Sequence, residues 1–444
     1  MGQWIQLIIL MILHGVIDMF AGMLPAVLPV LRTHFHLSLT LGVLLIAVLN
    51  FFANGVQIAA GHLREKSETS FFMRLGFPLA AFVCIMYLVP EGWYTLAILV
   101  AIMIVTGTGV AVFHPESMRA IHSFDRIPSS VATPFVVMGG YFGFCGGGWI
   151  GAELVDDGTG LKGLRYMLIA ALAGLILALV IKFRLAVEKE EGTTKTLRHE
   201  EEILVTRQEK KGTTKTLRHE EEGLVKKINA SPLPQSSPFR GEEEGRKRSL
   251  EDEDGEETEI QKKVAFWPLF FMASWICTGT AVTVALLPTH IEELRLELDF
   301  GGFSSFMFGA GIGIGGVLWG IIAHKVGELL SSVLSLMIGL PFLVVYFLLS
   351  SHKPAVIILL VCGFCIGGAY PMLVSMAMHA KEMNLGRRMG LMVGGVWGVA
   401  SLILIAAGSI ADKLGTFAVM FGAAGFFLIG GVYGIYLIRT GYGK

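Results

Sequence analysis

Ionisable side chains stand inside one of the most apolar stretches of this sequence. His14 and Asp18 are four residues apart in a run that is hydrophobic from about residue 5 to residue 31. Residues at this spacing share one face of a helix, and a carboxylate beside an imidazole can exchange protons near neutral pH. The pair therefore predicts handling of a proton or a substrate. The alternative is structural, because a neutral His14 bonded to Asp18 would lock a contact between helices.

A second group of such residues ends a glycine-spaced run, GTGVAVFHPESMRA at 107–120. Pro115 removes a backbone donor and bends a helix, which frees a carbonyl that polar neighbours or water must satisfy. His114 lies deepest in the apolar run and is the candidate for a cavity. Glu116 and Arg119, three residues apart, are expected to pair with each other, either as a plain interfacial salt bridge or as part of a gate.

Three amides form a third group, in which Asn50, Asn54 and Gln57 follow one another at spacings of four and three. This spacing places them on one helix face. They either line a polar cavity or hydrogen-bond to a neighbouring helix.

The composition shows which solvent surrounds these groups. Hydrophobic residues make up 53% of the chain and charged residues only 16%, whereas about a quarter of a soluble domain is charged. Apolar runs of about 20 residues, the length that crosses a bilayer, cover 5–31, 40–61, 72–89, 94–118, 128–153, 163–184, 266–290, 301–323, 329–350, 354–379, 387–410 and 416–438. Since lipid offers the backbone no hydrogen bonds, the sequence predicts an all-α membrane protein with twelve transmembrane helices.

Charged residues concentrate between the sixth and seventh runs, where GTTKTLRHEEE occurs at 192–202 and again at 212–222. High charge and few apolar residues predict a disordered linker over 186–264, between domains at 1–185 and 265–444. Lys and Arg in the short loops favour one side of the membrane, which predicts cytoplasmic N- and C-termini and a cytoplasmic linker. The five cysteines all fall in apolar runs and are expected to pack between helices.

The two halves of the chain repeat each other. The matches are Leu24-Pro25 with Leu287-Pro288, Gly107 and Pro115 with Gly363 and Pro371, and VMGGYFG at 137–143 with MVGGVWG at 392–398. Partners lie six spans apart, so both copies enter the membrane in the same direction. Two pseudo-symmetric six-helix bundles of this kind are the pattern of major facilitator transporters, which expose a site between the bundles to each side in turn.

Glycines cluster in the fifth and eleventh runs, where small residues let helices approach closely. They provide either a gating interface or simple tight packing. The candidate gating glycines are Gly139, Gly140, Gly143, Gly394, Gly395 and Gly398.

GTGVAVFHPESMRA resembles the span-four signature of the fosmidomycin-resistance family of major facilitator transporters, GTGxxxFHPExxR. HGVIDMFAGMLPAVLPVL at 14–31, VQIAAGHLREK at 56–66 and GGYFG at 139–143 resemble other parts of that family. The resemblance implies a proton-driven exporter of small molecules, with drug efflux and antibiotic resistance as the named activities. It also implies a gating role for Glu65, which takes the place of the family's acidic residue after the second span.

These observations predict an inner (plasma) membrane secondary transporter of a small organic solute, with export by proton antiport favoured. Uptake by proton symport is the first alternative, and a transporter-like sensor or scaffold acting through 188–263 is the second. We expect a monomer that binds a small-molecule substrate, protons and lipid. No enzymatic activity, cofactor or metal is expected. The sequence has no GxxxxGK[ST] motif on a soluble domain, which disfavours a primary pump, and no basic face that suggests a nucleic-acid partner.

Overall fold

The computed structural model describes residues 2–64, 67–124, 126–127, 129–156, 158–185, 265–380, 383 and 385–442. The predicted linker at 186–264 and the candidate gating residue Glu65 lie outside these residues. Every regular element among the described residues is helical, and twelve helices are long and apolar enough to cross a membrane. The prediction of an all-α chain with twelve spans is confirmed.

The spans of the first half combine α-helices with short 3₁₀ segments. They are α1 (Gln3–Phe35), α2 (Leu39–Leu63), α3 (Phe71–Ala80) with η1 (Ala81–Leu88), α4 (Thr95–Ile121), α5 (Ser129–Asp156), and η2 (Gly160–Tyr166) with α6 (Met167–Val180).

The spans of the second half include two interrupted helices. They are α9 (Phe266–Glu293), α10 (Leu298–Val326), α11 (Glu328–Leu349), η3 (Lys353–Ala355) with α12 (Val356–Ile366) and α13 (Ala369–Met378), α14 (Leu385–Gly390) with η4 (Leu391–Gly395) and α15 (Val396–Leu414), and α16 (Thr416–Arg439).

The same proline position has different effects in the two halves. Pro115 lies within an unbroken α4, whereas the equivalent Pro371 follows a break between α12 and α13. Proline cannot donate to the carbonyl four residues earlier, which is that of Gly367 in the second half. Gly367 and Gly368 stand at the break, where residues without a Cβ allow the chain to depart from the helix at little cost.

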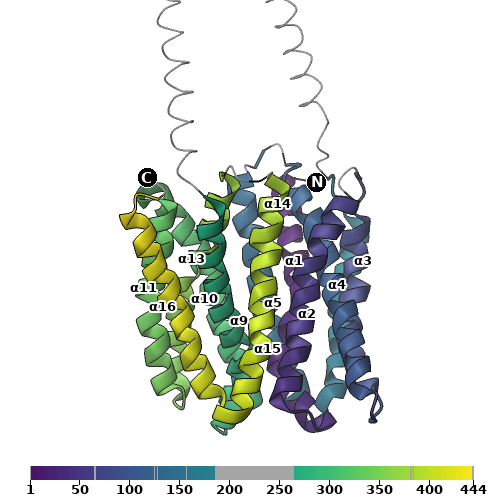
Figure 1. Ribbon diagram of the computed structural model, residues 1–444. Coiled ribbons are helices and arrows are strands. Elements are labelled where there is room, and N and C mark those ends of the chain that lie inside the picture. The colour runs from purple at the N-terminus through teal and green to yellow at the C-terminus, as the bar shows by residue number, and fades with distance from the viewer. Residues whose placement is uncertain are drawn as a thin grey trace, which may run out of the picture. The chain divides into compact units, whose positions relative to one another are not determined.

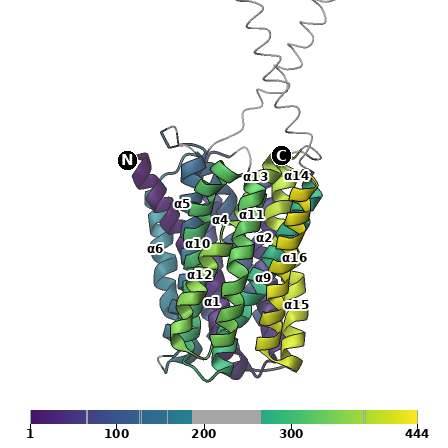
Figure 2. The same cartoon turned by 90° about the vertical axis from the view of Figure 1, so that its left-hand side faces the viewer.

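Both chain termini lie at the same end of the helices (Figures 1 and 2), as an even number of crossings requires. We call this the terminal end and the other the opposite end. Large apolar side chains face outward between the two ends, as in Ile169 and Leu348, which are 68% and 66% exposed. Lipid is the environment in which such an outer surface is stable.

The two halves meet along three pairs of helices: α5 with α10, α2 with α15, and α1 with α9. Glycines of α10 bring the first pair close, since a Cβ added at Gly302 would lie 2.8 Å from Ala152 and one at Gly313 would lie 3.3 Å from Tyr141. The second pair uses Gly408 of α15, where a Cβ would lie 2.7 Å from Val43. Small residues therefore set the distance between the halves, as is usual for helices in lipid.

The glycines of α5 pack mainly on α1, within the first half. A Cβ at Gly139 would lie 2.5 Å from Met11, and one at Gly143 would overlap the backbone of Gly15. These two candidate gating residues therefore sit at the contact between α1 and α5, whereas Gly398 of α15 has open space beside it.

We expect Gly143→Ala to destabilise the protein by about 1–3 kcal/mol, because the added methyl group overpacks a backbone contact. Thermal unfolding of the purified protein should show a lower apparent melting temperature. Gly398→Ala is the matched control: nothing lies within 4 Å of its added Cβ, and alanine favours helix over glycine by about 1 kcal/mol. Equal melting temperatures for the two variants would contradict the packing argument.

Candidate functional site

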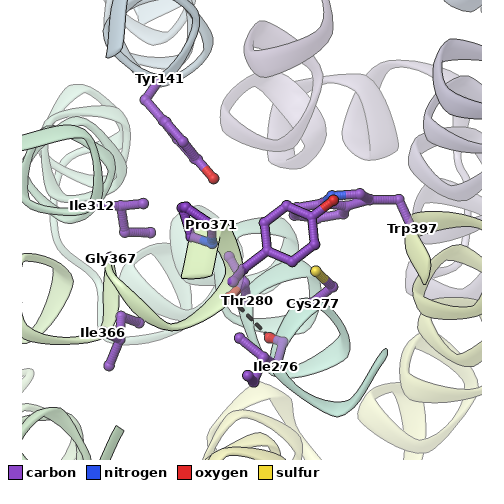
Figure 3. A pocket seen from close by; sticks show the side chains of 10 residues that line it. Tyr141, Ile276, Cys277, Thr280, Ile312, Ile366, Gly367, Pro371 and Trp397 are labelled. Atoms are coloured by element: carbon purple, nitrogen blue, oxygen red, sulfur yellow. Dashed lines mark hydrogen bonds between the residues drawn. The ribbon is translucent and has the colours of Figure 1, made fainter. Parts of the chain in front are cut away.

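A cavity lies where the two halves meet (Figure 3). Tyr141 comes from α5 of the first half, and the other nine lining residues come from the second half. Tyr370 and Trp397 add two further aromatic rings, whose centroids are 6.1 Å apart in an edge-to-face arrangement. None of the lining residues carries a charge.

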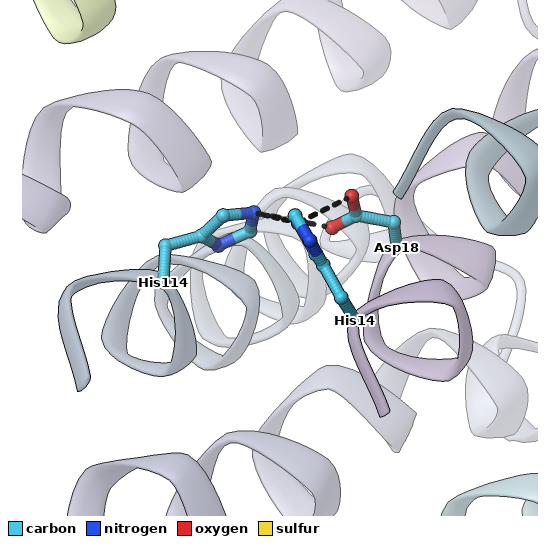
Figure 4. A group of neighbouring side chains, drawn as sticks. All are labelled: His14, Asp18 and His114. Atoms are coloured by element: carbon cyan, nitrogen blue, oxygen red, sulfur yellow. Dashed lines mark hydrogen bonds and ion pairs between the residues drawn. The ribbon is translucent and has the colours of Figure 1, made fainter. Parts of the chain in front are cut away.

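Three ionisable side chains of the first half lie close together (Figure 4). His14 and Asp18 are on α1, one turn apart, and His114 reaches them from α4. Nε2 of His14 lies 3.1 Å from Nε2 of His114 and 3.3 Å from Oδ2 of Asp18, and Nε2 of His114 lies 3.4 Å from Oδ1 of Asp18. We call these three residues the His–His–Asp cluster. The sequence analysis paired His14 with Asp18 and identified His114 apart from them, and the structure places all three together.

Two backbone carbonyls determine which nitrogens of the cluster carry hydrogen. Nδ1 of His14 lies 2.8 Å from the carbonyl oxygen of Val136 on α5, and Nδ1 of His114 lies 2.7 Å from that of Val110. A carbonyl oxygen can only accept, so both Nδ1 atoms are donors. In a neutral imidazole the other nitrogen then has a lone pair, so Nε2 of each ring is an acceptor unless an extra proton binds there.

The Nε2 atoms of the cluster therefore require a proton between them. Two lone pairs facing each other at 3.1 Å repel, whereas one added proton creates an N–H···N hydrogen bond of ordinary length. The ring that receives the proton becomes an imidazolium, and the Asp18 carboxylate beside it balances the charge. Such balance is needed because His14 is only 5% exposed and an unpaired buried charge is strongly unfavourable. One proton shared by the two Nε2 atoms would satisfy this geometry.

Gly140 allows α5 to cover the His–His–Asp cluster. A Cβ at this position would lie 2.7 Å from Oδ2 of Asp18 and 2.9 Å from Nε2 of His14. The next residue, Tyr141, lines the cavity. Adjacent residues of α5 thus contact the cluster and the cavity, so a movement of this helix reaches both.

Glu116 lies at the terminal end, away from the cluster, and is 1% exposed. Its Oε1 accepts from Nε of Arg64 at 3.1 Å, and its Oε2 accepts from the backbone N–H of Met73 in the first turn of α3. The partner of Glu116 is therefore Arg64 rather than the predicted Arg119. The buried carboxylate satisfies a free helix N–H and a guanidinium together, and so ties α4 to the end of α2 and the start of α3.

Arg119 joins the same region through backbone carbonyls. Its guanidinium donates to the carbonyl oxygens of Arg64 and Ser67, both at 2.6 Å. Glu116 and Arg119 thus hold the chain between α2 and α3 from two sides. This is the segment that contains Glu65.

The amides of α2 bond mainly within their own helix. Nδ2 of Asn54 donates to the carbonyl of Asn50 at 2.8 Å, and Nε2 of Gln57 donates to that of Ala53 at 2.7 Å. All three amide side chains are half-buried. Asn54 also lies at the contact between halves, since a Cβ at Gly394 would lie 3.1 Å from its carbonyl oxygen.

Gly394 and Gly395 lie in η4, a π-helical turn that precedes α15. Such turns are uncommon and often mark functional sites or hinges in helices. Gly394 faces Ile58 of α2 across the interface, at 3.1 Å for an added Cβ. The two candidate gating glycines therefore stand at an irregular point of a helix that contacts the other half.

Asp412, which the sequence analysis did not identify, joins the halves at the opposite end. Its carboxylate accepts from the backbone N–H groups of Leu39 and Thr40, at 2.9 and 2.7 Å, and from the hydroxyl of Thr40. A residue near the end of α15 thus caps the N-terminus of α2, where free N–H groups and the helix dipole favour an anion. The sequence has no local signal for this contact, because the residues are far apart in the chain.

The described residues contain one group of three metal-ligand types, and it is the His–His–Asp cluster, with one donor atom from each residue within 4.8 Å of the others. The direct contacts between these donors are explained by a proton. The absence of a metal or cofactor stays a prediction of the sequence.

These features define a polytopic membrane transporter: twelve spans in two repeated halves, with ionisable and cavity-lining residues where the halves meet. The sequence model described as Major Facilitator Superfamily matches residues 10–392. The chain therefore belongs to the Major Facilitator Superfamily, whose members are secondary transporters rather than enzymes. No curated protein matches the sequence.

Solved transporters share this fold. A POT family transporter in complex with a thioalcohol-conjugated peptide superposes with a TM-score of 0.64 at 11% identity, over 98% of this chain and 96% of that chain. A bacterial homologue of the human lysosomal transporter Spinster gives 0.61 at 13% identity, over 99% and 97%. At such low identity the likeness concerns the fold alone.

The protonation pattern of the cluster can be measured with ¹⁵N-labelled histidine. We expect both Nδ1 atoms of His14 and His114 to carry hydrogen, because each lies against a backbone carbonyl oxygen. His14→Asn and His114→Asn assign the signals, and His290, bonded to the hydroxyls of Thr416 and Ser350, is an internal control. A ring whose Nδ1 carries no hydrogen would contradict this assignment of donors.

Proposed function

We propose that this protein is a proton-coupled transporter that exports a small organic solute by alternating access. The observation that carries the proposal is the pair of facing Nε2 atoms in the His–His–Asp cluster, which are 3.1 Å apart. This arrangement is suited to binding and releasing a proton, and a plain helix contact does not need it. Intramembrane ionisable residues that face one another commonly belong to proton pathways.

Coupling follows if the cluster releases its proton when the protein moves between conformations. A proton entering down a potential of 100 mV supplies about 2.3 kcal/mol. Because α5 covers the cluster through Gly140 and lines the cavity through Tyr141, a solute in the cavity and a proton in the cluster both act on one helix. Proton binding can thus favour one orientation of α5 and solute binding the other.

Alternating access needs contacts between halves that form and break at each end. At the opposite end, the Asp412 carboxylate on the N-terminus of α2 is such a contact, and it must separate for that end to open. At the terminal end, the π-helical turn η4 supplies a point where α15 can bend against α2. These two places on one pair of helices support a rocking movement.

Export as the direction rests on the resemblance to the fosmidomycin-resistance family in the first half of the chain. The same resemblance supports drug-like solutes. We further propose a monomer in the inner membrane with cytoplasmic termini, the orientation that Lys and Arg in the short loops favour. Proteoliposomes loaded with labelled phosphonates, amphipathic drugs or metabolites would test substrate and direction together. If an inward proton gradient accelerates entry of the solute from the same side, the protein works by symport. That result would replace the proposal of export.

Asp18→Asn should abolish coupling while preserving the fold, because it keeps the side-chain shape and removes the charge that balances the imidazolium. We expect gradient-driven flux of a transported solute to fall by about tenfold or more, a loss on the order of 1.4 kcal/mol, while solute exchange without a gradient persists. Asp299→Asn is the matched control, since its carboxylate accepts from the adjacent N–H of Phe300. Unchanged coupled flux in Asp18→Asn would remove the cluster from the mechanism.

Asp412→Ala should favour opening of the opposite end, since it removes three hydrogen bonds between the halves. Spin labels at His34→Cys and Lys413→Cys, both exposed positions, would report the distance between α1 and α15 by pulsed EPR. We expect a larger population at long distance in Asp412→Ala. Glu297→Ala is the control, because its carboxylate pairs with Lys353 in the same half. Identical distance distributions would show that Asp412 is not a gate.

A further inference from the structure

The cavity is the counterpart, in the second half, of the His–His–Asp cluster in the first. Tyr370 precedes Pro371 as His114 precedes Pro115, and Cys277 stands before Pro288 at the same distance as His14 before Pro25. Tyr370 and Cys277 both line the cavity. Equivalent positions thus hold ionisable imidazoles in one half and an uncharged phenol and thiol in the other.

The cavity offers no partner to a charged solute. No Lys, Arg, Asp, Glu or His is among its ten lining residues, and the neighbouring cluster balances its own proton with Asp18. A charge brought out of water without a partner is strongly disfavoured. Anions such as phosphonates and carboxylates are therefore poorly suited to this cavity, and so are cations without a nearby counter-ion.

Two hydroxyls of the cavity lining can act only as acceptors. The Thr280 hydroxyl donates its hydrogen to the carbonyl of Ile276 at 3.0 Å (Figure 3), and the Tyr370 hydroxyl donates to the carbonyl of Met392 at 3.0 Å. Each hydroxyl has one hydrogen, so both oxygens can only accept from a ligand. The donors of the same lining are the Tyr141 hydroxyl, the Cys277 thiol and the Trp397 N–H.

The aromatic residues favour a flat ring. Tyr141 points into the cavity from the first half, and Trp397 lies on the other side (Figure 3). The ring of Tyr370 packs on that of Trp397 and also lines the cavity. Aromatic pairs prefer offset or edge-to-face contacts, and the crossed rings of Tyr370 and Trp397 provide surfaces for both. Ile312 and Ile366 complete an apolar wall.

We propose that the cavity binds the ring of a small, uncharged aromatic molecule that carries an O–H or N–H donor. This inference rests on the proposed function for its biological meaning, but it concerns equilibrium binding and makes no use of the proton cycle. Thr280 and Tyr370 accept from the donor of the ligand, and the three aromatic rings enclose its ring.

Three naphthalene probes separate the possibilities: 2-naphthol has a donor, 2-methoxynaphthalene has the same ring without a donor, and naphthalene-2-sulfonate is an anion. Saturable binding to the full-length protein in lipid nanodiscs would be measured for each, with protein-free nanodiscs to correct for partition into lipid. We expect 2-naphthol to bind most tightly and the sulfonate least.

Variants of the acceptors then test the position of the probe. Thr280→Val should weaken 2-naphthol about tenfold, the effect of one hydrogen bond to a buried group, and should leave 2-methoxynaphthalene unchanged. Thr283→Val is the matched control, because this threonine lies on the same helix, donates to its own helix at Gly279, and is not in the lining. Tyr370→Phe provides a second test that keeps the ring, in case Thr280→Val fails to fold.

Tighter binding of the sulfonate, equal effects of Thr280→Val and Thr283→Val, or no saturable binding of 2-naphthol would each overturn the proposal. Asp18→Asn keeps this experiment separate from the transport mechanism. If it loses proton coupling and still binds 2-naphthol, both ideas stand. If the wild-type protein shows no proton-coupled flux while the cavity variants lose naphthol binding, the cavity proposal stands and only the coupling proposal is refuted.

Discussion

The hydrogen bonds from Nδ1 of His14 and His114 to backbone carbonyls are the constraint on which the site depends. One carbonyl belongs to α5 and the other to α4, so the orientation of both rings is set by the packing of three helices. With these bonds made, the Nε2 atoms face each other at 3.1 Å, a distance that suits a shared proton. Close approach of α5 is then essential, and glycines at 139, 140 and 143 allow it where any side chain would collide with α1 or the cluster.

The repeat of the chain conserves shape and divides chemistry. Prolines and glycines recur in both halves, whereas the His–His–Asp cluster belongs to the first half and nine of the ten cavity-lining residues belong to the second. The two halves thus differ in polarity where they correspond in sequence. The link between them is α5, whose residues 140 and 141 contact one site each.

The sequence predicted the spans because lipid leaves the backbone only one way to satisfy its polar groups, and it predicted His14 with Asp18 because that pair is local. The approach of His114 depends on how α1 and α4 turn toward each other, which periodicity does not determine. Glu116 had two possible ion-pair partners, Arg119 nearby in the sequence and Arg64 far from it. A free N–H at the start of α3 binds the Glu116 carboxylate and holds it beside Arg64. Tyr370 could have been found by aligning His114-Pro115 with Tyr370-Pro371, whereas Asp412 has no signal in the sequence.

The two contacts of α2 with the second half differ in physical kind, and this difference bears on how the halves can move. At the opposite end, a carboxylate accepts from two N–H groups and a hydroxyl, an arrangement that is lost after a small displacement because hydrogen bonds depend steeply on geometry. At the terminal end, Ile58 lies on Gly394 and Gly390, and apolar contact without directional bonds tolerates sliding. The first contact is therefore either made or broken, whereas the second can adjust continuously. The span formed by α14, η4 and α15 thus combines a directional contact with α2 at one end and an apolar contact with α2 at the other.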